Sequence, residues 1–132
     1  MKYMKITIHQ KRQLNNITKK YHLNLLYLFG SQAKGAARTD SDFDIGYLPT
    51  DKFQNQDEQE LVADLNKIFH RQIDICNLKT ASPLLKMQIV KNGIFLAGER
   101  KARINFQVKA ISSYLDTAFL RRLTYEYNRS QI

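Results

Sequence analysis

A short apolar run that ends in glycine and serine limits most strongly what this chain can fold into. The run covers residues 24–29, and Gly30 and Ser31 follow it directly. Strand-forming residues ended by glycine are typical of a buried β-strand that enters a tight turn. In such a turn the glycine lets the backbone approach a phosphate group, and the serine hydroxyl and free N–H groups of a following helical turn point toward it. The segment therefore predicts a phosphate-binding turn.

Two aspartates follow this turn on a second predicted strand. Ten residues separate Ser31 from Asp42, and residues 42–48 alternate along the strand. Because side chains in a strand repeat every two residues, Asp42 and Asp44 project to one face while the apolar residues beside them enter the core. Neighbouring carboxylates repel each other, and hard cations such as Mg²⁺ relieve this repulsion by taking oxygen ligands. The pattern therefore predicts a metal site beside the phosphate turn.

A third acid is expected at the same site. Residues 72–78 form the next strand-like run, in which Asp74 lies between two isoleucines. If this strand neighbours the one that carries Asp42 and Asp44, the three carboxylates converge and hold two Mg²⁺ ions, and Asp74 accepts the proton of an attacking hydroxyl. The chemistry indicated is nucleotidyl transfer, an in-line attack on an α-phosphate from which pyrophosphate leaves.

Each acid also has a simpler interpretation. Aspartates often cap turns, so Asp42 and Asp44 could do only that. Aspartates on strands also pair with surface lysines, as Asp74 could. Ser31 is a good N-cap, which is compatible with phosphate binding. The joint spacing of the turn and the acids favours metal ligation over these alternatives.

Basic residues near these motifs are candidates for contacts to nucleotide phosphates: Lys34, Arg38, Lys86 and Lys91. We assign Lys34 and Arg38 to nucleotide binding together with Gly30 and Ser31. A lone lysine on a helix is more often solvated, so this alternative stays open for each of the four.

Periodicity and capping signals predict an α/β domain with a mixed sheet flanked by helices. The expected helices cover residues 9–21, 56–69 and 83–92, and a further strand covers residues 94–97. Ser82 and Pro83 provide an N-cap and first turn for the third helix, and Gly93 ends it. The length of 132 residues suits a single domain, residues 1–132.

Residues 30–44 resemble the signature of the polymerase β-like nucleotidyltransferases, and specifically of the minimal nucleotidyltransferase antitoxins of the MntA type. The likeness continues through residues 74–78 and 82–93 and covers roughly residues 20–100. The resemblance implies the polymerase β-like nucleotidyltransferase fold. It also implies that Gly30 and Ser31 hold a triphosphate, that Asp42 and Asp44 bind Mg²⁺, and that Asp74 is the third catalytic acid.

The resemblance also implies a function and a partner. Proteins of this type are encoded beside a HEPN-fold ribonuclease toxin, and they neutralise it by transferring AMP from ATP to a toxin tyrosine. The expected function is therefore a Mg²⁺-dependent protein adenylyltransferase acting as the antitoxin of a type VII-like pair. An alternative is a non-catalytic antitoxin that binds and occludes the toxin, because Gln32 and Lys34 stand where such antitoxins often carry arginine. Transfer to a small molecule is disfavoured, because no second domain is left to close over the acceptor.

An apolar stripe lies near the C-terminus, with its members spaced at intervals of four, three, four and three or four residues. Its members are Ile104, Val108, Ile111, Leu115 and Ala118 or Phe119. The stripe predicts a long helix over residues 103–125. We expect its inner half to pack on the protein's own sheet, because apolar stripes usually face the core. Its outer turns then present aromatic residues to helices of the partner toxin: Tyr114, Phe119, Tyr125 and Tyr127.

The formal net charge of +9, from 21 basic and 12 acidic residues, attracts nucleotides, nucleic acids or an acidic protein surface. Lysines and arginines are scattered along the chain, so direct binding of nucleic acid is not favoured over a solvated basic surface. No apolar run approaches the roughly 20 residues that cross a bilayer, and the N-terminus lacks a signal-like region, so we expect no membrane partner and a cytoplasmic location. Cys76 is the only cysteine, which excludes an internal disulfide.

Overall fold

The computed structural model describes residues 5–30 and 42–130. In chain order the elements are α1 (Ile8–Lys20), β1 (Leu23–Phe29), β2 (Phe43–Pro49), α2 (Asp57–Phe69), β3 (Ile73–Asn77), α3 (Pro83–Asn92), β4 (Ile94–Gly98) and α4 (Arg100–Ser130). Each helix and strand expected within these residues is present within a residue or two, except that α4 extends further at both ends. The helical turn expected after Gly30 lies outside the described residues. The expected α/β fold with a long C-terminal helix is confirmed.

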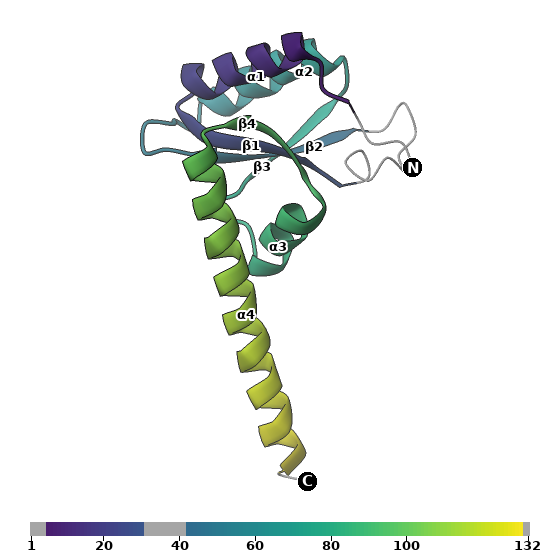
Figure 1. Ribbon diagram of the computed structural model, residues 1–132, viewed down its shortest axis with the longest axis vertical. Helices are drawn as coiled ribbons and strands as arrows, with labels where there is room; N and C mark the ends of the chain where they lie inside the picture. The colour runs from purple at the N-terminus through teal and green to yellow at the C-terminus, as the bar shows by residue number, and fades with distance from the viewer. Residues whose placement is uncertain (1–4, 31–41, 131–132) are drawn as a thin grey trace.

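The sheet has the strand order β3-β2-β1-β4. β2 and β3 are parallel, whereas β1 is antiparallel to both β2 and β4, so the sheet is mixed as predicted. Helices α1 and α2 cover one face of this sheet, and α3 and the upper part of α4 lie on the other face (Figure 1). The sheet therefore separates two apolar clusters.

Alternation along the strands divides the side chains between these two clusters. Phe43 and Ile45 of β2 pack with the apolar residues of α1 and α2. Leu25 and Tyr27 of β1 pack with residues of α3 and α4, among them Phe106. The even-numbered residues of β2 and β3 therefore face the α3 and α4 side, which is the side that carries the acids.

The ends of α3 form as the sequence predicts. The Ser82 hydroxyl accepts a hydrogen bond from the Leu85 backbone N–H at 3.1 Å, and Pro83 occupies the first turn. Gly93 ends the helix for a spatial reason, since a Cβ there would lie 2.5 Å from the Ile89 carbonyl oxygen. Any larger residue at this position would force the backbone of α3 or of the adjacent strand β1 to shift.

The prediction of how α4 packs is wrong. The stripe expected to face the sheet is exposed, at 45% for Ile104, 57% for Val108, 39% for Ile111 and 59% for Leu115. The helix packs instead through Phe106, whose ring lies 5.6 Å from that of Tyr27, and through the buried Ala110. One aromatic ring beside a small residue lets the helix approach the sheet more closely than a row of branched aliphatic side chains would.

The outer part of α4 extends beyond the sheet and α3 as a single helix (Figure 1). Residues 120–130 are all exposed. Of the aromatic residues expected to meet a partner, Tyr125 and Tyr127 are exposed and Tyr114 is half-buried, while the side chain of Phe119 is outside the described part of the structure. Within the described ranges no helix, α4 included, has the length and apolar character needed to span a membrane.

Asp64 on α2 joins α2 to α1. Its carboxylate accepts hydrogen bonds from the Tyr21 hydroxyl at 2.5 Å and from the Lys20 ammonium at 2.9 Å. Burial alone would raise the pKa of Asp64, but these hydrogen bonds and the charges of Lys20 and Lys67 outweigh it and lower the pKa. Asp64 therefore stabilises the fold in its ionised form.

We expect Asp64→Asn to lower the free energy of unfolding at neutral pH by about 1 kcal/mol, because charge-assisted hydrogen bonds are lost. Since the pKa of Asp64 is lowered on folding, its contribution is present above the ordinary aspartate pKa and is lost as pH falls through the folded value. Urea unfolding at neutral and at acidic pH, with Asp51→Asn as a surface control, measures this. A deficit of the same size at both pH values would contradict the assignment.

Candidate active site

Asp44 and Asp74 lie opposite each other in the sheet. They are register partners in the parallel pair β2 and β3, so both side chains point to the face covered by α3 and α4. Asp44 is half-buried and Asp74 is exposed. Asp42 immediately precedes β2 and is exposed as well. The structure thus places all three predicted acids at one end of two neighbouring strands.

The three carboxylates interact electrostatically. Burial is the largest cause that raises the pKa of Asp44, and the negative charges of Asp74 and Asp42 raise it further. Burial and the charge of Asp44 also raise the pKa of the Cys76 thiol, which follows Asp74 on the same face of β3. The ionised form of Asp44 is therefore disfavoured until a cation or a hydrogen-bond donor compensates its charge.

Gly30 lies against this group of acids. It follows Phe29, which pairs with Asp44 across β1 and β2, and its φ of +76° is one that glycine adopts without strain. A Cβ at this position would collide with Oδ2 of Asp44 and lie 3.3 Å from its Cγ. The backbone of the turn and the carboxylate can approach so closely only because residue 30 lacks a side chain.

The donor set at this end of the sheet suits Mg²⁺. Within residues 5–30 and 42–130, no three carboxylate, imidazole or thiolate groups are close enough together to hold a metal ion by themselves. Mg²⁺ is commonly bound by one or two carboxylates, with water and the phosphate oxygens of a substrate completing its octahedral shell. Asp42, Asp44 and Asp74 offer hard oxygen ligands beside a glycine turn, which fits this kind of shared site.

A cavity of about 300 Å³ opens beside Gly30, between the end of β1 and α3. Its walls include Phe29, Leu85 and two amide side chains of α3, Gln88 and Asn92. Neither amide was predicted from the sequence as a site residue. Their spacing of four residues on a helix that follows the third acid is the signal that points to them.

The remaining candidates fall into two groups. Ser31, Lys34 and Arg38 lie outside the described residues, so their part in nucleotide binding stays a prediction. Lys86 lines a different cavity, and Lys91 is exposed on α3 without lining the cavity beside Gly30. Neither lysine lines the cavity beside Gly30.

Comparison with known proteins agrees with this geometry. Residues 12–102 match the family model described as polymerase beta, nucleotidyltransferase. The chain is also 37% identical over 92 residues to the protein adenylyltransferase MntA of Shewanella oneidensis, an alignment that covers 70% of this chain and 66% of that protein. The predicted resemblance to MntA-type proteins is confirmed.

Two solved structures show the same fold at similar identity. One is a crystal structure of a toxin–antitoxin with AMP-PNP, with a TM-score of 0.71 and 29% identity, covering 90% of this chain and 98% of that one. The other contains a tri-AMPylated Shewanella oneidensis HEPN toxin in complex with its MNT antitoxin, with a TM-score of 0.62 and 30% identity, covering 91% and 98%. Since the family model matches well over half of its length, the chain belongs to the polymerase beta nucleotidyltransferase family.

Proposed function

We propose that this protein is the antitoxin of a HEPN toxin and that it acts as an adenylyltransferase, moving AMP from ATP to a toxin tyrosine. The observation that carries the proposal is the register pairing of Asp44 with Asp74 beside Gly30. The relative named a protein adenylyltransferase and the related complex with an AMPylated HEPN toxin support it. A cytoplasmic location fits this function and stays a prediction.

The site residues have distinct roles in this proposal. The backbone at Gly30, with Ser31, Lys34 and Arg38, holds the triphosphate of ATP. The cavity between β1 and α3 takes the nucleoside, and Gln88 and Asn92 hydrogen-bond to it. Three carboxylates hold two Mg²⁺ ions: Asp42, Asp44 and Asp74. When bound, Mg²⁺ neutralises the phosphate charge and aligns the α-phosphate for attack.

The transfer step follows from these positions. The tyrosine oxygen attacks the α-phosphorus of ATP and forms a new P–O bond. The bond from the α-phosphorus to the bridging oxygen breaks, and pyrophosphate leaves with the electron pair. Asp74 is exposed at the edge of the site and accepts the tyrosine proton. The half-buried Asp44 stays beside the bound nucleotide during this step.

Neutralisation by occlusion is the second candidate, and the exposed length of α4 is the observation that favours it. In that case the toxin is inhibited without being modified. Mass spectrometry of toxin co-purified with this protein separates the two functions. Toxin that carries one or more AMP units supports transfer, and fully inhibited toxin without any added mass supports occlusion.

We expect Asp44→Asn and Asp42→Asn each to reduce AMP transfer from labelled ATP to the toxin by about a hundredfold or more, because charge compensation at the phosphates is lost. The matched control is Asp51→Asn, an exposed aspartate on the loop between β2 and α2, which should keep full activity. AMP incorporation at the wild-type rate in both site variants would refute the assignment.

Asp44→Asn should leave the fold intact in the absence of ligand. Burial and neighbouring charges disfavour the ionised carboxylate, so its removal should not lower the free energy of unfolding. Mg²⁺-ATP should raise the melting temperature of the wild type and of Asp51→Asn but not of Asp44→Asn. Equal stabilisation of all three proteins by Mg²⁺-ATP would show that Asp44 does not contribute to the nucleotide site.

Asn92→Ala should raise the KM for ATP by about tenfold with little change in kcat, because the lost hydrogen bond serves nucleotide binding before and during transfer alike. Lys91→Ala is the matched control, since Lys91 is the adjacent exposed residue that does not line the cavity. Steady-state kinetics with toxin as the acceptor measures both variants. The same KM for the two variants would place the nucleoside elsewhere.

A further inference from the structure

An unpartnered apolar stripe runs along α4 on the side away from the sheet. At about 100° per residue, Ile104, Val108, Ile111 and Leu115 lie within an arc of about 60°, opposite the packed face that is centred on Phe106. All four side chains are large and exposed. Helices with apolar residues on two opposite faces usually bury both faces. One of them remains open in the described structure.

The spacing along the stripe favours a helix as the element that covers it. Intervals of four, three and four residues match the a and d positions of a heptad repeat, which present knobs and holes to a facing helix. Within about 80° of the centre of the stripe, the sequence carries no charged residue between residues 104 and 118. A chain with a net charge of +9 thus keeps this face of α4 free of charge between residues 104 and 118.

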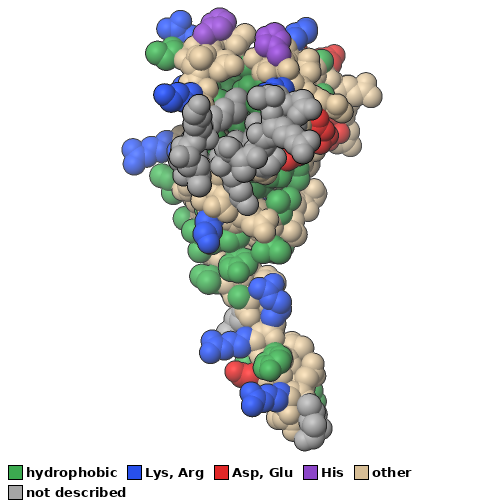
Figure 2. Space-filling view, turned by 90° about the vertical axis from the view of Figure 1, so that its right-hand side faces the viewer, with side chains coloured by type: hydrophobic (Ala, Val, Ile, Leu, Met, Phe, Trp, Pro, Cys, Tyr) green, Lys and Arg blue, Asp and Glu red, His purple; other side chains and the backbone are tan. Residues whose placement is uncertain are grey.

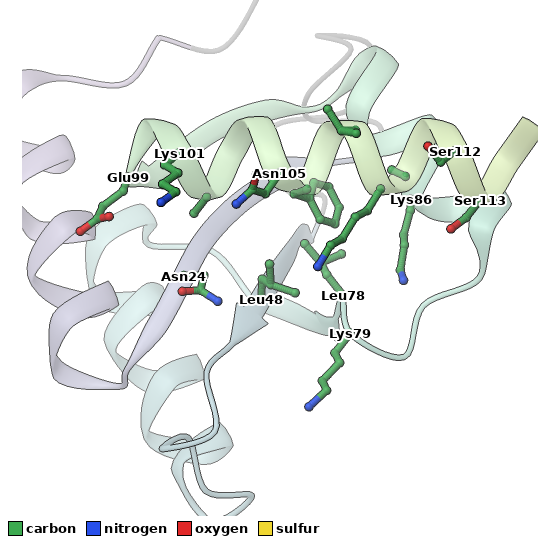
Figure 3. A pocket seen from close by; sticks show the side chains of 15 residues that line it. Asn24, Leu48, Leu78, Lys79, Lys86, Glu99, Lys101, Asn105, Ser112 and Ser113 are labelled. Carbon is green, nitrogen blue, oxygen red and sulfur yellow. The ribbon is translucent and has the colours of Figure 1, made fainter.

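A basic groove continues from the stripe. A cavity of about 640 Å³ lies between α4 and the facing elements, and Val108 belongs both to its wall and to the stripe. Its floor is apolar and includes Leu48 and Leu78 (Figure 3). Four lysines line it, two from α4, one from α3 and one from the loop after β3: Lys101, Lys109, Lys86 and Lys79.

These lysines lack acidic partners in the described part of the chain. Glu99 is the one acidic residue in the wall of the groove, and no ion pair joins any of the four lysines to another described residue. Their charges are therefore available to an acidic ligand that lies along α4.

The same charges make a second copy of this chain an unsuitable occupant. Helix α4 carries seven basic and two acidic residues, so two copies paired along their stripes would bring like charges together. Figure 2 shows basic side chains at intervals along the projecting stem. A helix with acidic residues along one flank fits both the stripe and the groove.

We infer that the α4 stripe and the lysine groove together form a docking surface for an amphipathic helix of the partner toxin. The apolar residues of that helix lie on Ile104, Val108, Ile111 and Leu115, and its acidic flank lies in the lysine groove. This surface lies at the end of the strands where β1 begins and β2 ends, whereas the acids lie where β1 ends and β2 begins. The inference rests on the proposed function for the identity of the partner, but it does not depend on AMP transfer.

Two pairs of variants of the full chain test the docking surface by biolayer interferometry against the HEPN toxin of the proposed pair. Leu115→Asn is matched with Leu120→Asn, since both leucines are on α4 and are similarly exposed, at 59% and 61%, but Leu120 lies off the stripe. Lys109→Glu is matched with Lys11→Glu on α1. We expect Leu115→Asn and Lys109→Glu to weaken toxin binding by about tenfold or more, and the two controls to stay within about twofold of the wild type. All four should bind ATP normally.

Each result has a defined meaning. Equal toxin binding by Leu115→Asn and Leu120→Asn would overturn the docking surface, as would a wild-type protein that does not bind the toxin. A wild-type dimer in light scattering that Leu115→Asn converts to a monomer would also overturn it, because the stripe would then join two copies. Toxin binding that depends on Leu115 and Lys109 without any AMP transfer would support the docking surface and refute the proposed enzymatic function.

Discussion

The parallel pairing of β2 with β3 is the constraint on which the candidate site depends. It puts Asp44 opposite Asp74 and directs both carboxylates to one face of the sheet. The antiparallel neighbour β1 ends at the same place, so Gly30 meets the same group of acids. A shift of the β2–β3 register by one residue would send one acid into the apolar cluster under α1 and α2, and the site would be lost.

The two faces of the sheet have different roles. On one face, α1 and α2 bury a continuous apolar cluster that stabilises the fold. The other face carries a smaller cluster around Tyr27, together with the acids, the cavity beside Gly30 and the lysine groove. The raised pKa of Asp44 indicates that the protein keeps charge at this site at some expense of stability. Binding of a cation and a nucleotide would recover that free energy.

The parts of this structure that were predictable depend on short-range patterns. Strand alternation, the Ser82 cap and the chemistry of the Gly30 turn are encoded within a few residues, and they located the strands and the acids correctly. The packing face of α4 was not predictable in this way. Ile104 and Phe106 are both apolar, and the choice between them depends on Tyr27, which is far away in the sequence. Gln88, Asn92 and the lysine groove were missed for the same reason, since each cavity joins segments that only the folded chain brings together.

We propose that a metal–nucleotide complex binds between Gly30 and the acids at the start of β2 and β3. Amide NMR spectra recorded with AMP-PNP and paramagnetic Mn²⁺ in place of Mg²⁺ test this claim most directly, because broadening falls off steeply with distance from the ion. The strongest broadening should occur at the amides of Gly30, Asp44 and Asp74. Broadening centred on the lysine groove, or spread evenly over the protein, would contradict it.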